Sequence, residues 1–203
     1  MSPRPLPRSF YDRPVLDVAR DLLGAVIARD GVEVRLTEVE AYDGARDPAS
    51  HAFRGMTPRN AVMFGAAGHA YVYFTYGMHF CVNLVCGPPE VAAAVLLRAG
   101  EVIRGHDIVR ERRPKAATRD FARGPARLTL ALAIDRELDG VDVTKPRSAI
   151  VVRQGEPVDP DRVKSGPRIG VAQAADRPWR FWLEGEPTVS SYRPHVPRRR
   201  ART

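Results

Sequence analysis

Apolar residues recur along parts of the chain with the spacing of short helices. In residues 14–24 they lie three and four positions apart, with a proline near the first turn and a glycine at the end. This pattern predicts a helix, because it gathers the apolar side chains on one face. Residues 106–113 and 125–133 are also predicted to be helical, and the second follows Gly124-Pro125, a pair typical of a helix start.

Runs of β-branched and aromatic residues predict an antiparallel sheet. Residues 25–28 and 32–42 flank Asp30-Gly31, a pair that favours the positive φ angles of a tight hairpin turn. Further strands are expected over residues 71–76, 79–85, 91–98, 150–153, 168–171 and 180–183. This order of elements indicates an α+β protein with a single domain, in which helices surround a curved, largely antiparallel sheet.

The two ends differ in composition from the rest of the chain. Residues 1–13 and 194–203 are rich in Pro and Arg, and the second segment contains Arg198-Arg199-Arg200. We expect flexible basic segments at both ends. Between them, over residues 14–193, no repeat or long linker interrupts the predicted domain.

The charge of the chain bears on its partners. Its 203 residues include 32 Lys and Arg against 24 Asp and Glu, a net charge of +8. This favours a polyanion as partner, although a solvated basic surface would give the same balance. Apolar stretches stay shorter than the roughly 18 residues of a membrane span, and residues 1–13 lack the apolar centre of a signal peptide. We expect a cytoplasmic monomer, associated with the nucleoid if bacterial, with no membrane partner.

The cysteines and histidines do not predict a metal site. Cys81 and Cys86 are two residues where a structural zinc or iron–sulfur site needs four ligands. We interpret both as thiols of the core. The histidines and cysteines also lack the H-x-E and C-x-x-C spacings of a metal-dependent deaminase. We therefore expect no metal and no cofactor.

The predicted strand over residues 32–42 carries acids at apolar positions. Strict alternation points Glu38 and Glu40 to the same side as the apolar residues of the strand. A buried carboxylate is costly unless it is paired, so the pair is either neutralised by an arginine such as Arg98 or used in catalysis. A β-bulge near Glu38 would remove this argument.

Tyrosines concentrate around the expected hairpin of residues 71–85. Tyr76, followed by Gly77-Met78, lies at its tip, where small polar residues are usual. A tyrosine there either packs on a neighbouring loop or acts as a wedge for another molecule. Asn83 lies among apolar residues in the next strand, and a satisfied core amide is its simplest interpretation.

Together these residues form a series of motifs that closely resembles the alkyladenine (3-methyladenine) DNA glycosylase family. Order and spacing match over about residues 16–192, and the matching segments are EVEAY (38–42), DPASH (47–51), TPRN (57–60), MF (63–64), YVYFTYGM (71–78), Asn83, VLLRA (95–99), GP (124–125), RIGV (168–171) and PWRF (178–181). The resemblance implies the alkyladenine-type fold, similar to a formyltransferase C-terminal domain, with a DNA-intercalating β-hairpin.

The resemblance also implies a reaction. Members of the family remove alkylated or deaminated purines from double-stranded DNA by hydrolysing the N-glycosidic bond, which requires the nucleotide to leave the stack. Glu40 matches the general base that activates a water. Arg98 matches the residue that orients Glu40 and the water, helped by the backbone carbonyl at about Ile169.

The remaining site residues are carried over in the same way. Tyr42 is expected on one face of the flipped base, with His51 and Tyr73 on the other. Asn83 matches the position that restricts purines bearing an exocyclic amine.

The DNA contacts follow from the hairpin motif and its neighbour. Tyr76 matches the residue that enters the minor groove, and we expect Gly77, Met78 and Arg59 to contact DNA with it.

Two other classes explain less of the sequence. A non-catalytic DNA-binding homologue accounts for the charge and the tyrosines but leaves Glu40 without a role. A nucleoside hydrolase needs the acid but no basic surface. Strand cleavage by a glycosylase requires an amine, and the three lysines lie outside the pocket motifs, which predicts a monofunctional enzyme.

Overall fold

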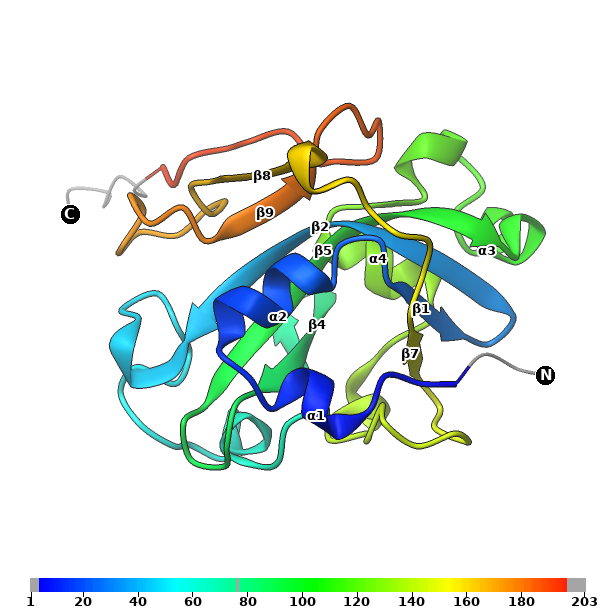
Figure 1. Ribbon diagram of the computed structural model, residues 1–203. Helices are drawn as coiled ribbons and strands as arrows, with labels where there is room; N and C mark the ends of the chain where they lie inside the picture. The colour runs from blue at the N-terminus through cyan, green and yellow to red at the C-terminus, as the bar shows by residue number, and fades with distance from the viewer. Residues whose placement is uncertain (1–3, 76, 197–203) are drawn as a thin grey trace, which may run out of the picture.

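A large antiparallel sheet runs through the computed structural model, which describes residues 4–75 and 77–196 (Figure 1). Six strands lie in the order β3-β4-β5-β2-β1-β7, β6 pairs with β5, and the ribbon of β8 and β9 joins along β2. The described strands are β1 Val26–Arg29, β2 Val32–Asp43, β3 Ala70–Thr75, β4 His79–Cys86, β5 Ala93–Arg104, β6 Ala122–Arg123, β7 Val151–Arg153, β8 Val163–Gly166 and β9 Arg180–Leu183. The α+β class and the largely antiparallel sheet are confirmed.

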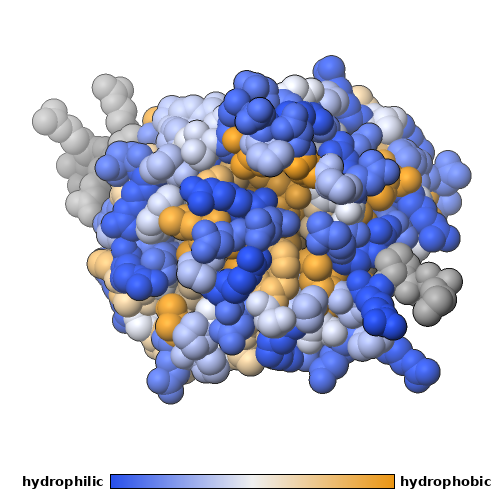
Figure 2. All heavy atoms as spheres, in the orientation of Figure 1, coloured by the Kyte–Doolittle hydropathy of each residue, from blue (hydrophilic) through white to orange (hydrophobic). Residues whose placement is uncertain are grey.

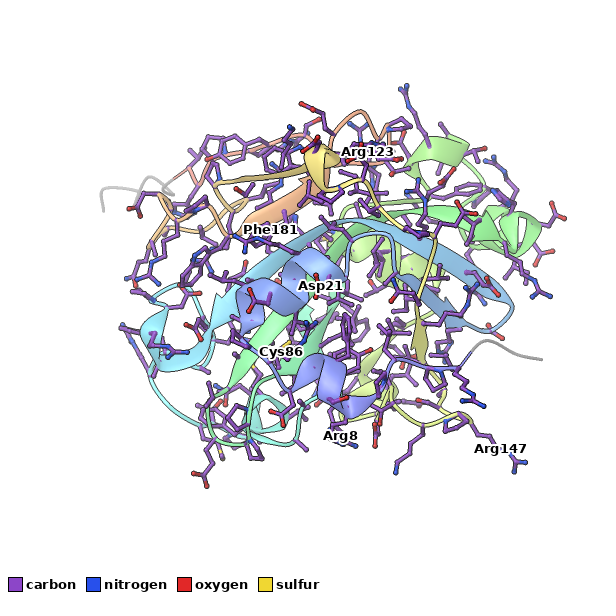
Figure 3. The ribbon with its side chains drawn as sticks, in the orientation of Figure 1. Arg8, Asp21, Cys86, Arg123, Arg147 and Phe181 are labelled. Atoms are coloured by element: carbon purple, nitrogen blue, oxygen red, sulfur yellow. The ribbon has the colours of Figure 1, made fainter. Side chains whose placement is uncertain are left out.

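The helices are short and pack around the sheet, and the first of them, at Arg8–Tyr11, was not predicted from the sequence. Their bounds in the described residues are α1 Arg8–Tyr11, α2 Val15–Asp21, α3 His106–Arg112 and α4 Pro125–Ala131, with 3-10 turns at Gly44–Arg46, Ala61–Phe64, Thr118–Asp120, Arg136–Leu138 and Pro160–Arg162. All four α-helices contribute to one apolar core with the strands. Phe181 joins this core from β9, beside α2 (Figure 3). None of the helices described here is long and apolar enough to cross a membrane.

The first hairpin forms as predicted. Asp30 and Gly31 have φ angles of 50° and 76°, which suit the tight turn that joins β1 to β2. The prediction of a strand over residues 168–171 is wrong, because the strand β8 ends at Gly166 and an irregular loop follows. Gly170 has a φ of 71°, and the side chain of Arg168 occupies the interior, so this segment does not extend the ladder.

Residues 4–13, the described part of the segment expected to be flexible, pack against the rest of the domain. Tyr11 is completely buried, and the amide of Leu6 donates to the carbonyl of Val152 at 2.7 Å. Arg8 forms an ion pair with Asp142 at 2.7 Å. The few apolar residues among the prolines and arginines anchor this segment to the core, and the basic run at 198–200 lies outside the described residues.

A β-bulge in β2 reverses the faces of this strand. Up to Leu36 the even positions point into the core, but the pairing with β5 shifts on both sides of Glu38. Beyond the shift Val39 and Ala41 face the core instead. The prediction that Glu38 and Glu40 share the side of the apolar residues is therefore wrong, although both carboxylates are fully buried. The bulge turns them to the opposite face of the sheet, where a cavity lies.

One face of the molecule is largely hydrophilic, with apolar atoms visible near its centre (Figure 2). A cavity of about 620 Å³ is lined there by residues of α1 and α2 and by the segment that leads into β8.

Candidate active site

A cavity of about 560 Å³ lies on the face of the sheet opposite the main core. Strands β2 to β5 supply its floor, and the loops of residues 48–54 and 169–173 supply two of its walls. Most residues expected from the sequence to form the site line this cavity, namely Tyr42, His51, Tyr73, Asn83, Arg98 and Ile169. Four strands and two distant loops thus bring together residues that are far apart in the sequence.

Glu40 is buried directly beneath these lining residues. Its carboxylate accepts three hydrogen bonds, from the hydroxyl of Tyr42 at 2.9 Å, from Nη1 of Arg98 at 3.1 Å and from the amide of Ile169 at 2.7 Å. The carbonyl at about Ile169 was expected to assist here, but the group that contacts Glu40 is the Ile169 amide. A carboxylate offers about four lone-pair directions, so one direction remains for a further donor.

Arg98 is held at a second bulge, opposite the one in β2. The pairing passes from Ala99 to Leu97 without including Arg98, which leaves this residue unpaired in the ladder. Its Nε donates to Glu38 at 2.9 Å while Nη1 reaches Glu40. Burial acts to lower the pKa of Arg98, but the charges of Glu40 and Glu38 have the larger effect. The net result is a pKa above the ordinary value. The guanidinium therefore stays charged.

Aromatic rings form one side of the cavity. The rings of Tyr71 and Tyr73 stack with centroids 5.4 Å apart, and the ring of His51 meets Tyr73 edge-on at 4.6 Å. Nδ1 of His51 lies 3.1 Å from the hydroxyl of Tyr71. Burial and the charge of Arg59 lower the pKa of His51, which favours the neutral imidazole. The structure thus brings His51 and Tyr73 together, as expected.

Tyr42 lies against a buried arginine. The guanidinium carbon of Arg168 is 4.6 Å from the centre of the Tyr42 ring, a cation–π distance. Burial raises the pKa of Tyr42 well above its ordinary value, and the charge of Glu40 raises it further. The hydroxyl therefore stays protonated and can donate to Glu40.

The ion pair of Arg168 with Asp47 was not predicted as part of the site. Both side chains are fully buried and bonded through two contacts, at 2.5 and 2.8 Å. A further bond at 2.9 Å runs from Arg168 to the carbonyl of Ala41. The pair ties the loop that carries His51 to the loop that carries Ile169. Both residues lie within motifs that the sequence singled out, but their pairing across 121 positions depends on the fold.

The floor of the cavity contains an amide and a thiol. Nδ2 of Asn83 donates to the carbonyl of Tyr71 at 3.2 Å, as expected of a satisfied amide, and the side chain also lines the cavity. Cys86 belongs to the core as predicted, whereas Cys81 lines the cavity; both are free thiols. Burial raises the pKa of Cys81.

The hairpin expected to enter DNA is described except at its tip. β3 and β4 pair from Ala70 to Thr75, and Tyr76 lies outside the described residues. Gly77 and Met78 are exposed, Met78 at 67%. Arg59 donates to the carbonyl of Phe74 at 3.1 Å and lies 5.6 Å above the Tyr73 ring. The exposed residues expected to contact DNA thus lie near the end of this hairpin.

Within residues 4–75 and 77–196, no group of three or more His, Cys, Asp and Glu side chains is placed to hold a metal ion.

Comparison with known proteins agrees with the motifs. Residues 9–187 match the family described as methylpurine-DNA glycosylase. A relative from Streptomyces avermitilis is 58% identical over 203 residues, covering 97% of this chain and 95% of the relative. Relatives from Frankia casuarinae and Burkholderia orbicola are 54% and 47% identical, each covering 94% of this chain and 93% of the relative. All three bear the name "Putative 3-methyladenine DNA glycosylase". The resemblance is confirmed, and the chain belongs to the methylpurine-DNA glycosylase family.

Proposed function

We propose that this protein excises alkylated or deaminated purines from double-stranded DNA by hydrolysing the N-glycosidic bond. The observation that carries the proposal is the buried carboxylate of Glu40, held by three donors beneath a cavity lined with aromatic rings. The cavity volume of about 560 Å³ lies within the range of roughly 300–1,000 Å³ that is usual for small-molecule sites.

The base would be held by stacking after it leaves the duplex. Tyr42 would lie on one face, and His51 with Tyr73 on the other, at about 1–3 kcal/mol for each base–aromatic contact. Asn83, on the floor, would restrict purines with an exocyclic amine. A neutral His51 supports this arrangement, because it adds no positive charge against a cationic alkylpurine.

Glu40 would act as the general base. Its remaining lone-pair direction can accept a proton from a water that attacks C1′ of the sugar. The same carboxylate can stabilise the positive charge that develops on the sugar as the bond to the base breaks. The charged Arg98 would keep the carboxylate in one orientation during this step.

The hairpin would keep the DNA open while the base is in the cavity. Tyr76, at the tip, would fill the gap in the stack, with Gly77, Met78 and Arg59 at the DNA surface. The product would be an intact abasic site, because among the described residues no lysine lines the cavity to form a Schiff base.

A panel of duplexes, each carrying one modified purine, tests the proposal. Purified protein should release 3-methyladenine, 7-methylguanine, hypoxanthine or ethenoadenine from at least one duplex and leave unmodified DNA intact. The strand should break only after alkali is added. If the protein binds the duplexes but releases none of these bases, it is a non-catalytic DNA-binding homologue and the proposal is wrong.

A further inference from the structure

A second carboxylate, that of Glu38, lies next to the site but does not line the cavity. It is fully buried and accepts hydrogen bonds from Nε of Arg98 at 2.9 Å and Nε of Arg180 at 2.7 Å. The amide and hydroxyl of Ser190 donate to it at 2.7 and 2.9 Å. Oε1 accepts three of these bonds and Oε2 accepts the fourth, from the Ser190 amide. Because the carboxylate is fully buried and does not line the cavity, it is not placed to contact a substrate.

Arg98 connects this carboxylate to Glu40. One guanidinium donates through Nε to Glu38 and through Nη1 to Glu40. Because the guanidinium is planar and rigid, fixing its Nε end fixes the direction in which Nη1 approaches Glu40. The orientation of the proposed general base therefore depends on how firmly Glu38 is held.

Burial alone would raise the pKa of Glu38, but Arg98, Arg180 and Ser190 lower it below the ordinary value. The carboxylate is therefore ionised and can balance two buried arginines.

The segment of residues 188–193, which we call the C-terminal strap, holds Glu38 from the outside. It runs beside β8 and β9 (Figure 1), at the end of the molecule where Arg123 lies (Figure 3). Besides the two bonds from Ser190, hydrogen bonds to other elements fix it. They run from Arg180 to the Ser190 carbonyl, from Arg123 to the Val189 carbonyl and the Ser191 hydroxyl, from the Gly170 amide to the Arg193 carbonyl, and between the hydroxyls of Thr37 and Thr188. The strap thus touches both Glu38 and the loop whose Ile169 amide binds Glu40.

We propose that Glu38 and Ser190 are positioning residues for base excision: the strap holds Glu38, Glu38 holds Arg98, and Arg98 orients Glu40. The inference rests on the proposed function and deepens it. The match to the family description covers residues 9–187, so it ends just before the strap. A purely structural ion pair would affect folding alone, whereas a positioning role affects the chemical step.

The test compares three variants with the wild type in single-turnover excision, lesion-duplex affinity and thermal melting. Ser190→Ala removes one of the four bonds to Glu38 and should lower the excision rate roughly tenfold, while affinity and melting temperature change little. Ser190→Thr keeps the hydroxyl and should retain most of the rate. Ser165→Ala, the same change at an exposed serine of β8 outside the strap, is the matched control and should excise at the wild-type rate.

A fourth variant, Glu38→Gln, should lower the rate roughly a hundredfold where it folds. If the wild type excises the base and Ser190→Ala excises it at the same rate, this inference is overturned and the proposed function stands. A rate loss in Ser190→Ala that is matched by loss of affinity or of melting temperature would also overturn it. Absence of excision by the wild type would refute the proposed function, and this inference with it.

Discussion

At the scale of single residues, buried ion pairs hold the walls of the cavity in place. Arg168 and Asp47 are both fully buried, so removing one charge leaves the other without a partner. We expect Arg168→Met to lower the free energy of unfolding by about 3–5 kcal/mol, measured by urea denaturation. The double variant Arg168→Met, Asp47→Leu should recover much of this loss, because no unpaired charge remains. A loss under about 1 kcal/mol in the single variant would contradict the pairing.

Glu38 makes the stability of the protein depend on pH. Its pKa is lower in the folded protein than the ordinary value of 4.5, so its contribution to stability is complete above that value. The contribution is lost as the pH falls from 4.5 through the folded pKa, because the unfolded chain takes up the proton first. The free energy of unfolding should therefore fall on acidification below about pH 4.5, and fall less steeply in Glu38→Gln. Parallel curves for the two proteins would contradict the assignment.

At the scale of elements, the β1–β2 hairpin and the helices α2, α3 and α4 could be predicted because their signals are local, whereas α1 and β8 were not predicted. Asp30-Gly31 determines its own turn, and Gly124-Pro125 precedes α4 as expected. The side of the sheet to which Glu38 and Glu40 point could not be predicted, because it depends on bulges that form only when β2 pairs with β5. The sequence identified both carboxylates as unusual, but only the pairing shows which side they face.

Contacts between residues far apart in the sequence could not be predicted either. Residues 168–171 have the composition of a strand, but Arg168 forms a buried ion pair with Asp47 and the segment becomes a loop. Ser190 gives no signal in the sequence, since its role comes from a carboxylate 152 positions away.

The β3–β4 hairpin is the element expected to enter DNA. Replacing Tyr76 by Ala should weaken capture of the flipped base, because the ring would no longer fill the gap in the duplex. Folding should change little if the ring fills the duplex rather than the protein core. The measurements are lesion-duplex affinity and melting temperature of the variant. A large drop in melting temperature would show instead that Tyr76 packs against the protein.

At the scale of the whole molecule, the net charge of +8 should govern binding to unmodified DNA. Arginines that contact phosphates displace condensed counterions, so affinity should fall steeply between about 50 and 200 mM salt. Titration of a duplex without a lesion at several salt concentrations gives the slope of log affinity against log salt. A slope near zero would mean that the positive charge does not serve DNA binding.

The central claim is that Glu40 activates the attacking water. The most direct measurement is the single-turnover excision rate of Glu40→Gln, on a duplex from which the wild type releases the modified base, together with the affinity for the same duplex. Glutamine keeps the shape of the side chain but cannot take the proton, so the rate should fall by at least roughly a hundredfold while affinity stays within about tenfold. A Glu40→Gln protein that excises at nearly the wild-type rate would contradict the account.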